Sequence, residues 1–170
     1  MHTTNTKLTE IHGEGDVKRL QPRPAIRAPV DTVWEALTSI DHVRQWWSDG
    51  HIGTNPGDRI QLASPEDVDG TILIMMKPHV FAFTWHDEPH RSSHPQWIES
   101  ATNSLVHFDL VQNAPEATLL TLIQFAPSIS ALGAAAGWHH LFELLTSYLE
   151  TGVVVTGDQR FEQLKALYGA

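Results

Sequence analysis

The sequence predicts a single α+β domain in which a series of antiparallel strands is followed by a long C-terminal helix. Residues 50–125 form short β-like runs separated by turn signals, and residues 130–152 carry the longest uninterrupted helical pattern. A chain of 170 residues fits one domain, and no internal repeat, low-complexity tract or linker divides it. We therefore expect a flexible N-terminus over 1–13, the folded domain over 14–152, and a C-terminal extension over 153–170 whose short helix packs on the same domain.

Composition and charge argue against several classes of function. The formal net charge is −9 and no cluster of Lys and Arg is present, so we expect no nucleic-acid partner. No apolar run reaches the roughly eighteen residues of a membrane-spanning helix, so we expect no membrane insertion. The polar N-terminus also lacks the pattern of a signal peptide. Cysteine is absent, which removes disulfides, thiolate metal sites and cysteine nucleophiles. These observations together predict a cytoplasmic protein.

The N-terminal part of the domain is predicted to hold one strand and two short helices. Residues 14–27 form an extended segment, and Pro22 and Pro24, which lack backbone donors, place it at a sheet edge or make it irregular. Apolar residues at helical spacing then predict a helix over 30–37 and a second helix over 41–47. The main sheet follows these helices.

A run of antiparallel strands occupies the middle of the chain. Alternating or β-rich stretches predict strands at residues 59–63, 71–76, 80–86, 105–111 and 118–125. Turn residues separate these runs, and the last two form a hairpin. The polar segment 87–104 is long for a loop, and loops of this length are often functional or mobile.

The long C-terminal helix has a large apolar face, but its first turns are small. Side chains at spacings of three and four share that face: Trp138, Leu141, Phe142, Leu145, Tyr148 and Leu149. Ser130 is the predicted N-cap, and Gly152 is the predicted residue after the helix end. The segment 133–137 contains only Gly and Ala, so another backbone or a ligand can come close to the helix there.

Several motifs occur in the order seen in one known superfamily. They are APVDTVWEALTSIDHVRQWW at 28–47, Gly70 with Ile72, Thr84-Trp85, Gly137-Trp138 through Leu145, and LETG at 149–152. Over about residues 14–152 the chain thereby resembles the helix-grip superfamily (SRPBCC), which includes START domains and the major pollen-allergen fold. Within this superfamily it resembles the branch named for the activator of Hsp90 ATPase homologue.

The resemblance implies a curved antiparallel β-sheet wrapped around the long C-terminal helix, with an apolar cavity between them. Residues 14–152 are therefore expected to be a helix-grip domain of the ligand-binding type. The eukaryotic co-chaperones of this branch carry a further N-terminal domain for engaging the chaperone, and this chain has no room for one. We therefore do not expect an Hsp90-type chaperone as a partner, and we leave a homodimer open.

The candidate ligand cavity follows from the resemblance together with the period-two faces of the strands. Its predicted lining is Trp46, Trp47, Ile72, Ile74, Met76, Trp85, Val106, Phe108, Leu120, Leu122, Gln124, Gly133, Gly137, Trp138, His140 and Leu141. The alternative is that these side chains pack as a dry core, because large voids are rare in protein interiors. Gln124 is a lone polar side chain on an apolar face, so it needs a hydrogen-bond partner, which a ligand or an ordered water could supply.

The histidines suggest a metal site, which we weigh against the spacing. His107 and Asp109 share one strand face near His86, and imidazole with carboxylate suits zinc. That face is predicted to be solvent-facing and no HExxH-like spacing occurs, so we assign no metal and no cofactor. On the long helix, His139 and Glu143 are four residues apart and are predicted to form a solvated pair.

We predict that the protein binds a small, largely apolar molecule. One alternative is a stress- or chaperone-associated interaction module without a ligand. Another is an enzyme of the cyclase, aromatase or hydrolase type that uses Gln124, His140 or Tyr148 in the same cavity. No GxSxG motif or comparable nucleophile pattern occurs, so catalytic activity stays open and we assign no catalytic residue.

Overall fold

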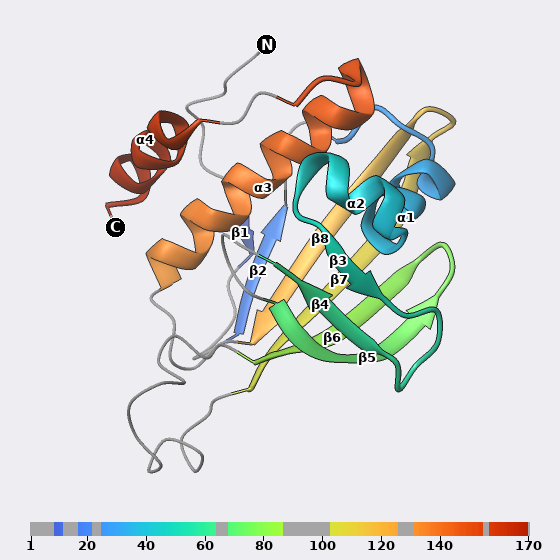
Figure 1. The fold of residues 1–170 in the computed structure, drawn as a ribbon. Helices are drawn as coiled ribbons and strands as arrows, with labels where there is room; N and C mark the ends of the chain where they lie inside the picture. The colour runs from blue at the N-terminus through green and yellow to red at the C-terminus, as the bar shows by residue number, and fades with distance from the viewer. Residues whose placement is uncertain are drawn as a thin grey trace, which may run out of the picture.

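The computed structural model describes residues 9–11, 17–21, 25–63, 68–86, 103–125, 131–154 and 157–169. The helices are α1 (Val30–Thr38), α2 (Ile40–Trp46), α3 (Ala131–Thr151) and α4 (Asp158–Tyr168). The strands are β1 (Thr9–Ile11), β2 (Val17–Gln21), β3 (Gly50–Ile52), β4 (Arg59–Leu62), β5 (Val68–Met76), β6 (Val80–His86), β7 (Asn103–Ala114) and β8 (Ala117–Phe125). Within the described residues, these strands form one antiparallel sheet in the order β1-β2-β8-β7-β6-β5-β4-β3 (Figure 1).

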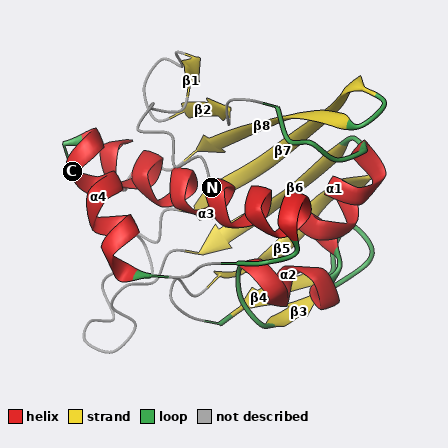
Figure 2. Ribbon diagram, turned by 90° about the horizontal axis from the view of Figure 1, so that it is seen from above, coloured by secondary structure: helices red, strands yellow, loops and turns green. Residues whose placement is uncertain are grey.

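Helix α3 lies across one face of the sheet, and the other helices are arranged around it (Figure 2). α1 and α2 lie near the C-terminal half of α3, where the rings of His42 and Tyr148 are 6.2 Å apart. α4 lies beside the N-terminal half, where the rings of His140 and Phe161 are 5.9 Å apart. The predicted α+β helix-grip class is therefore confirmed: a curved antiparallel sheet holds the long C-terminal helix.

Alternation along the strands decides which side chains face α3. On β8, Leu120, Leu122 and Gln124 are buried, whereas the residues between them are partly exposed. On β7, Val106 and Phe108 are buried in the same way. The predicted period-two faces of these two strands are confirmed.

Of the two predictions for residues 14–27, an edge strand or an irregular one, the structure agrees with the second, since β2 covers only Val17–Gln21 and Ile26 forms an isolated bridge with Thr118. β2 lies between β1 and β8, and it ends at Gln21. Pro22 and Pro24 follow the strand in the sequence, so neither of them removes a donor from its ladder. β1 falls within the segment that we predict to be flexible, and it pairs with β2. Its sequence TEI contains one apolar residue, which is too little for a period-two pattern to predict a strand.

Strand β5 starts earlier than predicted and contains an irregularity. The register between β5 and β6 shifts between Ile72 and Ile74. Ile72 is fully buried, but beyond it Met75 packs against the core while Met76 is 63% exposed. The predicted common face of Ile72, Ile74 and Met76 is therefore wrong beyond Ile72, because a bulge moves the following side chains to the other face.

Gly70 allows strands β5 and β6 to come unusually close. A Cβ at this position would lie 1.6 Å from the carbonyl oxygen of Thr84. Beside this contact, the hydroxyl of Thr84 accepts a hydrogen bond from the backbone N–H of Thr71 at 2.9 Å. The Gly70 and Thr84-Trp85 motifs therefore belong to one junction between two neighbouring strands.

The helices form where their apolar spacing predicts them. Gly152 follows α3 with a φ of 69°, the left-handed conformation predicted for the residue after the helix end. α4 begins at Asp158 with Gly157 as its N-cap. Ser130, the predicted N-cap of α3, lies outside the described residues. Of the helices in the described part of the chain, none is both long and apolar enough to cross a membrane.

Candidate functional site

An aromatic cluster centred on Trp138 lies between α3 and the sheet. The ring centroid of Trp138 is 5.8 Å from that of Trp47, 6.0 Å from that of Trp85 and 5.7 Å from that of Phe108. Trp46 joins through Trp47, with 5.5 Å between their rings. We call Trp46, Trp47, Trp85 and Trp138 the indole cluster. The fold thus brings together aromatic side chains from α2, β6 and α3 that are far apart in the sequence.

Gln124 holds the ring of Trp138 from the side of the sheet. The residue is 2% exposed, and its Oε1 accepts a hydrogen bond from Nε1–H of Trp138 at 2.9 Å. A buried polar side chain needs such a partner. Where the sequence leaves the partner to a ligand or a water, the structure supplies a residue of α3. The bond also fixes the orientation of the indole ring.

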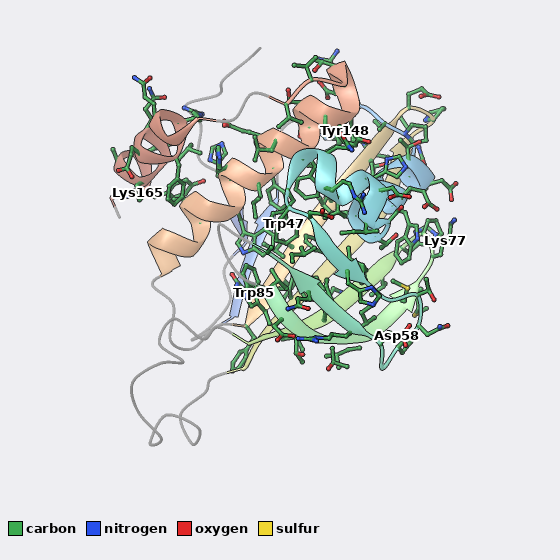
Figure 3. The ribbon with its side chains drawn as sticks, viewed as in Figure 1. Trp47, Asp58, Lys77, Trp85, Tyr148 and Lys165 are labelled. Carbon is green, nitrogen blue, oxygen red and sulfur yellow. The ribbon has the colours of Figure 1, made fainter. Side chains whose placement is uncertain are left out.

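The four indoles differ in exposure and in hydrogen bonding. Nε1–H of Trp46 donates to the carbonyl oxygen of Ala36 at 2.9 Å, which ties α2 to α1. Trp47 is partly exposed, whereas the other three are buried. Within the described residues, the indole N–H groups of Trp47 and Trp85 form no hydrogen bond. Trp47 and Trp85, 6.3 Å apart and labelled in Figure 3, therefore offer two donors on an aromatic surface that runs from solvent into the interior.

The buried face of the sheet forms the floor of this site. Its buried members among the predicted residues are Ile72, Val106, Phe108, Leu120 and Leu122. Phe81 and Phe83 of β6 are buried on the same floor, and each ring lies 6.4 Å from that of Phe108. Phe81 and Phe83 are not among the predicted lining residues. Their period-two relation to Trp85 is the signal that points to them.

Some predicted lining residues lie away from the indole cluster. Met76 is exposed at the end of β5, and Ile74 is only partly buried. Leu141 is a partly buried residue packed against the core. The β5 irregularity explains the positions of Met76 and Ile74, since a bulge cannot be read from a short apolar run.

The small residues at the start of α3 lie close to the interior. Ala136 is fully buried and Ala135 nearly so, whereas Gly137 is partly exposed. Gly133 belongs to α3, but its surroundings lie outside the described residues. The backbone of α3 therefore approaches the core where the sequence carries its smallest side chains.

A polar junction joins α3 to α4. His139 is 2% exposed, and its Nε2 lies 3.3 Å from Oε1 of Glu143 while its Nδ1 lies 3.0 Å from the hydroxyl of Tyr168. Glu143 also accepts two hydrogen bonds from Arg160, one of them from Nε at 2.9 Å. The predicted pairing of His139 with Glu143 is confirmed, but its predicted solvated setting is wrong, because α4 covers the pair.

Glu143 is ionised at this junction because its pKa is lowered. Burial raises the pKa of Glu143, but hydrogen bonds from Arg160 and His139 and their positive charge outweigh this effect. The pKa of Glu143 is consequently lowered from 4.5 to about 2. Glu143 therefore stays ionised at neutral and mildly acidic pH, and its contact with Arg160 is an ion pair.

The remaining polar candidates do not join the indole cluster. Nε2 of His107 and Oδ1 of Asp109 are 2.9 Å apart on the opposite face of β7 from Phe108. The hydroxyl of Tyr148 is 2.8 Å from Nδ1 of His42, at an exposed contact between α3 and α2. Among the described residues, no three His, Asp or Glu side chains gather as a metal site requires. His90 and His94, in the predicted loop 87–104, lie outside the described residues.

The chemistry of the site is that of an aromatic, apolar surface with few polar groups. The indole cluster and the sheet floor contain no charged side chain. Their polar groups are the indole N–H donors and the amide of Gln124. Such a surface recognises a molecule by burying its apolar area, and a few donors fix its orientation.

The model of one protein family matches residues 27–150 of this sequence, and that family is described as "Activator of Hsp90 ATPase homolog 1-like protein". The matched range runs from just before α1 to the end of α3 and leaves α4 outside. Comparison of the sequence with curated proteins gives no significant match.

Several solved structures are similar to this fold. Protein MLL2253 from Mesorhizobium loti has 21% identity and a TM-score of 0.65, over 81% of this chain and 99% of that chain. DynU16, described as a putative protein in the dynemicin biosynthetic locus, has 25% identity and a TM-score of 0.69, over 84% of this chain and 50% of that chain. The Aha1 dimer from Colwellia psychrerythraea has 18% identity and a TM-score of 0.60, over 79% of this chain and 97% of that chain.

Proposed function

The chain belongs to the family of activator of Hsp90 ATPase homolog 1-like proteins, and on that premise we propose that it binds a small, largely apolar molecule between the sheet and α3. The proposed site is the indole cluster with the sheet floor beneath it. Its ligand packs against Trp47 and Trp85 and presents a hydrogen-bond acceptor to their N–H groups. A small molecule as ligand agrees with the description of DynU16 as a protein of a biosynthetic locus.

The partial exposure of Trp47 is the observation that carries this proposal. Trp47 touches Trp46, Trp85 and Trp138, all of which are buried. A large aromatic side chain that is in contact with both solvent and an aromatic interior suits the mouth of a binding site. Gly137, which precedes Trp138 on α3, is partly exposed and has no side chain to cover the neighbouring indole.

An interaction module without a ligand is the second candidate, and the ring contacts of the indole cluster favour it. Centroid distances of 5.5 to 6.3 Å between the indoles are those of rings packed directly on one another. In this case the partly exposed Trp47 is a contact for another protein. The Colwellia protein is described as a dimer, so a second copy of this chain is one such partner, and sedimentation analysis tests it. The cytoplasmic location stays a prediction.

Native mass spectrometry of freshly purified protein separates the two candidates. The ligand-binding proposal expects an added mass of a few hundred daltons that disappears when the protein is denatured. Unliganded protein should also bind the apolar fluorophore 1-anilinonaphthalene-8-sulfonate. An interaction module shows neither the added mass nor the bound fluorophore.

Replacing Trp47 tests the location of the site. Trp47→Leu should weaken fluorophore binding by about tenfold, because the wall loses aromatic contact area and one donor. Phe125→Leu is the control, since Phe125 is an exposed aromatic residue at the end of β8, outside the indole cluster. Gly137→Leu should also weaken binding, because it adds a large side chain to α3 directly before Trp138 of the indole cluster. Unchanged affinity in both site variants would place the bound fluorophore elsewhere and contradict the proposal.

A further inference from the structure

Helix α4 is attached to α3 through a contact with an unusual feature, an unpartnered imidazole nitrogen. Nδ1 of His140 is buried and has no hydrogen-bond partner among the residues that the structure describes. The ring of His140 lies 5.9 Å from that of Phe161, at an interplanar angle of 46°. The ring of His140 is thus next to an apolar ring of α4, and its buried Nδ1 has no polar neighbour to bind in the described part of this contact, whereas water could bind it if α4 moved away. A buried, unpaired polar atom of this kind costs free energy as long as the contact stays closed.

The rest of the contact between α3 and α4 is satisfied and holds the helix in place. Leu164 is fully buried on α4, and Tyr168 is buried beside His139. Arg160 binds both carboxylate oxygens of Glu143. α4 is thus held by an apolar contact, a two-bond ion pair and a hydroxyl–imidazole hydrogen bond, and within the described residues Nδ1 of His140 is the buried side-chain atom without a partner.

We propose that α4 is a strap released by acid: it docks on α3 while His140 is neutral, and it comes off when that imidazole takes up a proton. The inference does not depend on a ligand. The strap lies against the N-terminal half of α3, the helix whose Trp138 forms part of the indole cluster (Figures 1 and 2). Its release would free one side of that helix.

The sign of the effect follows from the charged state that docking disfavours. Burial lowers the pKa of His140 below its ordinary 6.5, and the charges of Arg160 and His139 act in the same direction, whereas Glu143 opposes them. A histidine with a lowered pKa in the docked state stabilises docking fully above its ordinary pKa. That stabilisation is lost as the pH falls through about 6.5, because the released state takes up the proton first. Each unit by which docking lowers this pKa changes the docking equilibrium by about tenfold.

The other titratable groups at the contact do not supply the same response. On α3 they are His139 and Glu143, and Glu143 stays ionised until the pH approaches about 2. On α4, the hydrogen bond to Glu143 raises the pKa of Arg160 further above its already high ordinary value, so Arg160 keeps its charge over the whole range. Lys165 and Tyr168 are the other polar groups of α4 at this contact. Among the described residues, His139 is the other imidazole at this contact, so the test must separate its effect from that of His140.

Hydrogen exchange of the full-length protein measures the release directly. Between about pH 7.5 and about pH 5.5, protection of the amides of α4 should fall several-fold after correction for the intrinsic exchange rate. Protection of β7 should stay constant and serves as the internal reference. Undiminished protection of α4 across this range would overturn the proposal.

Four variants assign the response to its residue. His140→Phe keeps a ring against Phe161 but cannot be protonated, so its α4 should stay protected at low pH. His140→Leu is used instead if the His140→Phe variant does not fold. His139→Gln should keep the acid response of α4. The assignment to His140 would be overturned if His139→Gln lost the acid response, or if both His140 variants kept it. Glu162→Gln is the matched control on the exposed side of α4, where Glu162 pairs only with Lys165 among the described residues.

Discussion

Gln124 and Trp138 form the central polar contact of an otherwise apolar site. The amide oxygen of Gln124 and the indole N–H of Trp138 satisfy each other at 2.9 Å in a buried position. Each would be unpaired without the other, and no water is needed to complete the pair. The contact therefore joins α3 to β8 in one orientation, which apolar contacts alone do not specify.

Replacing Gln124 measures the strength of this contact. Gln124→Leu should lower the free energy of unfolding by about 1–3 kcal/mol, because it leaves the buried N–H of Trp138 without an acceptor. Gln61→Leu, at an exposed position of β4, is the control and should change it by less than about 0.5 kcal/mol. Chemical denaturation followed by tryptophan fluorescence gives both values. Equal effects of the two substitutions would contradict a structural role for the hydrogen bond.

The sequence predicts part of this residue-level picture. The apolar neighbours of Gln124 on alternate positions mark its side chain as buried, and a buried amide requires a partner. The identity of that partner depends on how α3 crosses the sheet, which no local pattern contains. The predicted solvated setting of His139 is wrong for the same reason. Its position on the polar stripe of α3 predicts exposure to solvent, and only the docking of α4 buries it.

At Gly70, strands β5 and β6 lie so close together that no side chain fits between them. Gly70 faces the carbonyl oxygen of Thr84, and the hydroxyl of Thr84 caps the backbone N–H of Thr71. The next residue along β6 is Trp85, a member of the indole cluster. The approach of the two strands at Gly70 therefore sets the position of one wall of the candidate site.

Gly70→Ala tests this junction. The added methyl group must displace β6, so the free energy of unfolding should fall by about 3 kcal/mol, at the upper end of the cost of overpacking. Gly157→Ala is the control, because a Cβ there meets nothing within 4 Å and the φ of −176° is extended. Its effect should stay below about 1 kcal/mol. Thermal or chemical unfolding that shows similar losses for both variants would contradict the close approach.

At the level of elements, long periodic segments are predicted well and short or irregular ones are not. α1, α2, α3 and α4 all carry apolar residues at helical spacing, and each forms where that spacing places it. β1 and β3 have three residues each, too few for an alternating pattern. The irregularity in β5 inverts the side-chain faces after Ile72, and a bulge is set by pairing with the neighbouring strand rather than by local sequence.

On the scale of the whole molecule, the residues matched by the family model form one part of the fold, and α4 packs on that part from outside the matched range. The matched residues 27–150 include the helices α1 to α3 and most of the sheet, whereas α4 lies beyond them. α3 is thus covered by the sheet on one side and by α4 along another (Figure 2). The sequence predicts both helices, but it does not predict the buried polar junction between them, because that junction combines residues from two separate periodic patterns.

The acid stability of the whole fold should depend on this junction. Because the pKa of Glu143 is lowered from 4.5 to about 2, its ionised form stabilises the folded state above pH 4.5. That contribution is lost as the pH falls from 4.5 towards 2. Glu143→Gln should therefore be less stable than the native protein at neutral pH, and the difference should shrink across this range.

Denaturation midpoints measured at a series of pH values check this expectation. The control is Glu162→Gln, which removes an exposed carboxylate of α4 and should follow the native profile. A Glu143→Gln profile parallel to the native one at every pH would show that the Arg160 pair contributes nothing to acid stability. The window for Glu143 lies below the one in which His140 acts, so the two effects can be read from one titration.

Consecutive residues of α3 face different layers of the molecule. One peptide bond separates the indole of Trp138, hydrogen-bonded to β8, from the imidazole of His139, hydrogen-bonded to α4. Indole fluorescence responds to the hydrogen bond of the ring and to charge near it, and α4 itself contains no tryptophan. Because the chain contains six tryptophans, a variant that keeps Trp138 alone would be needed to follow the position of α4 through this indole.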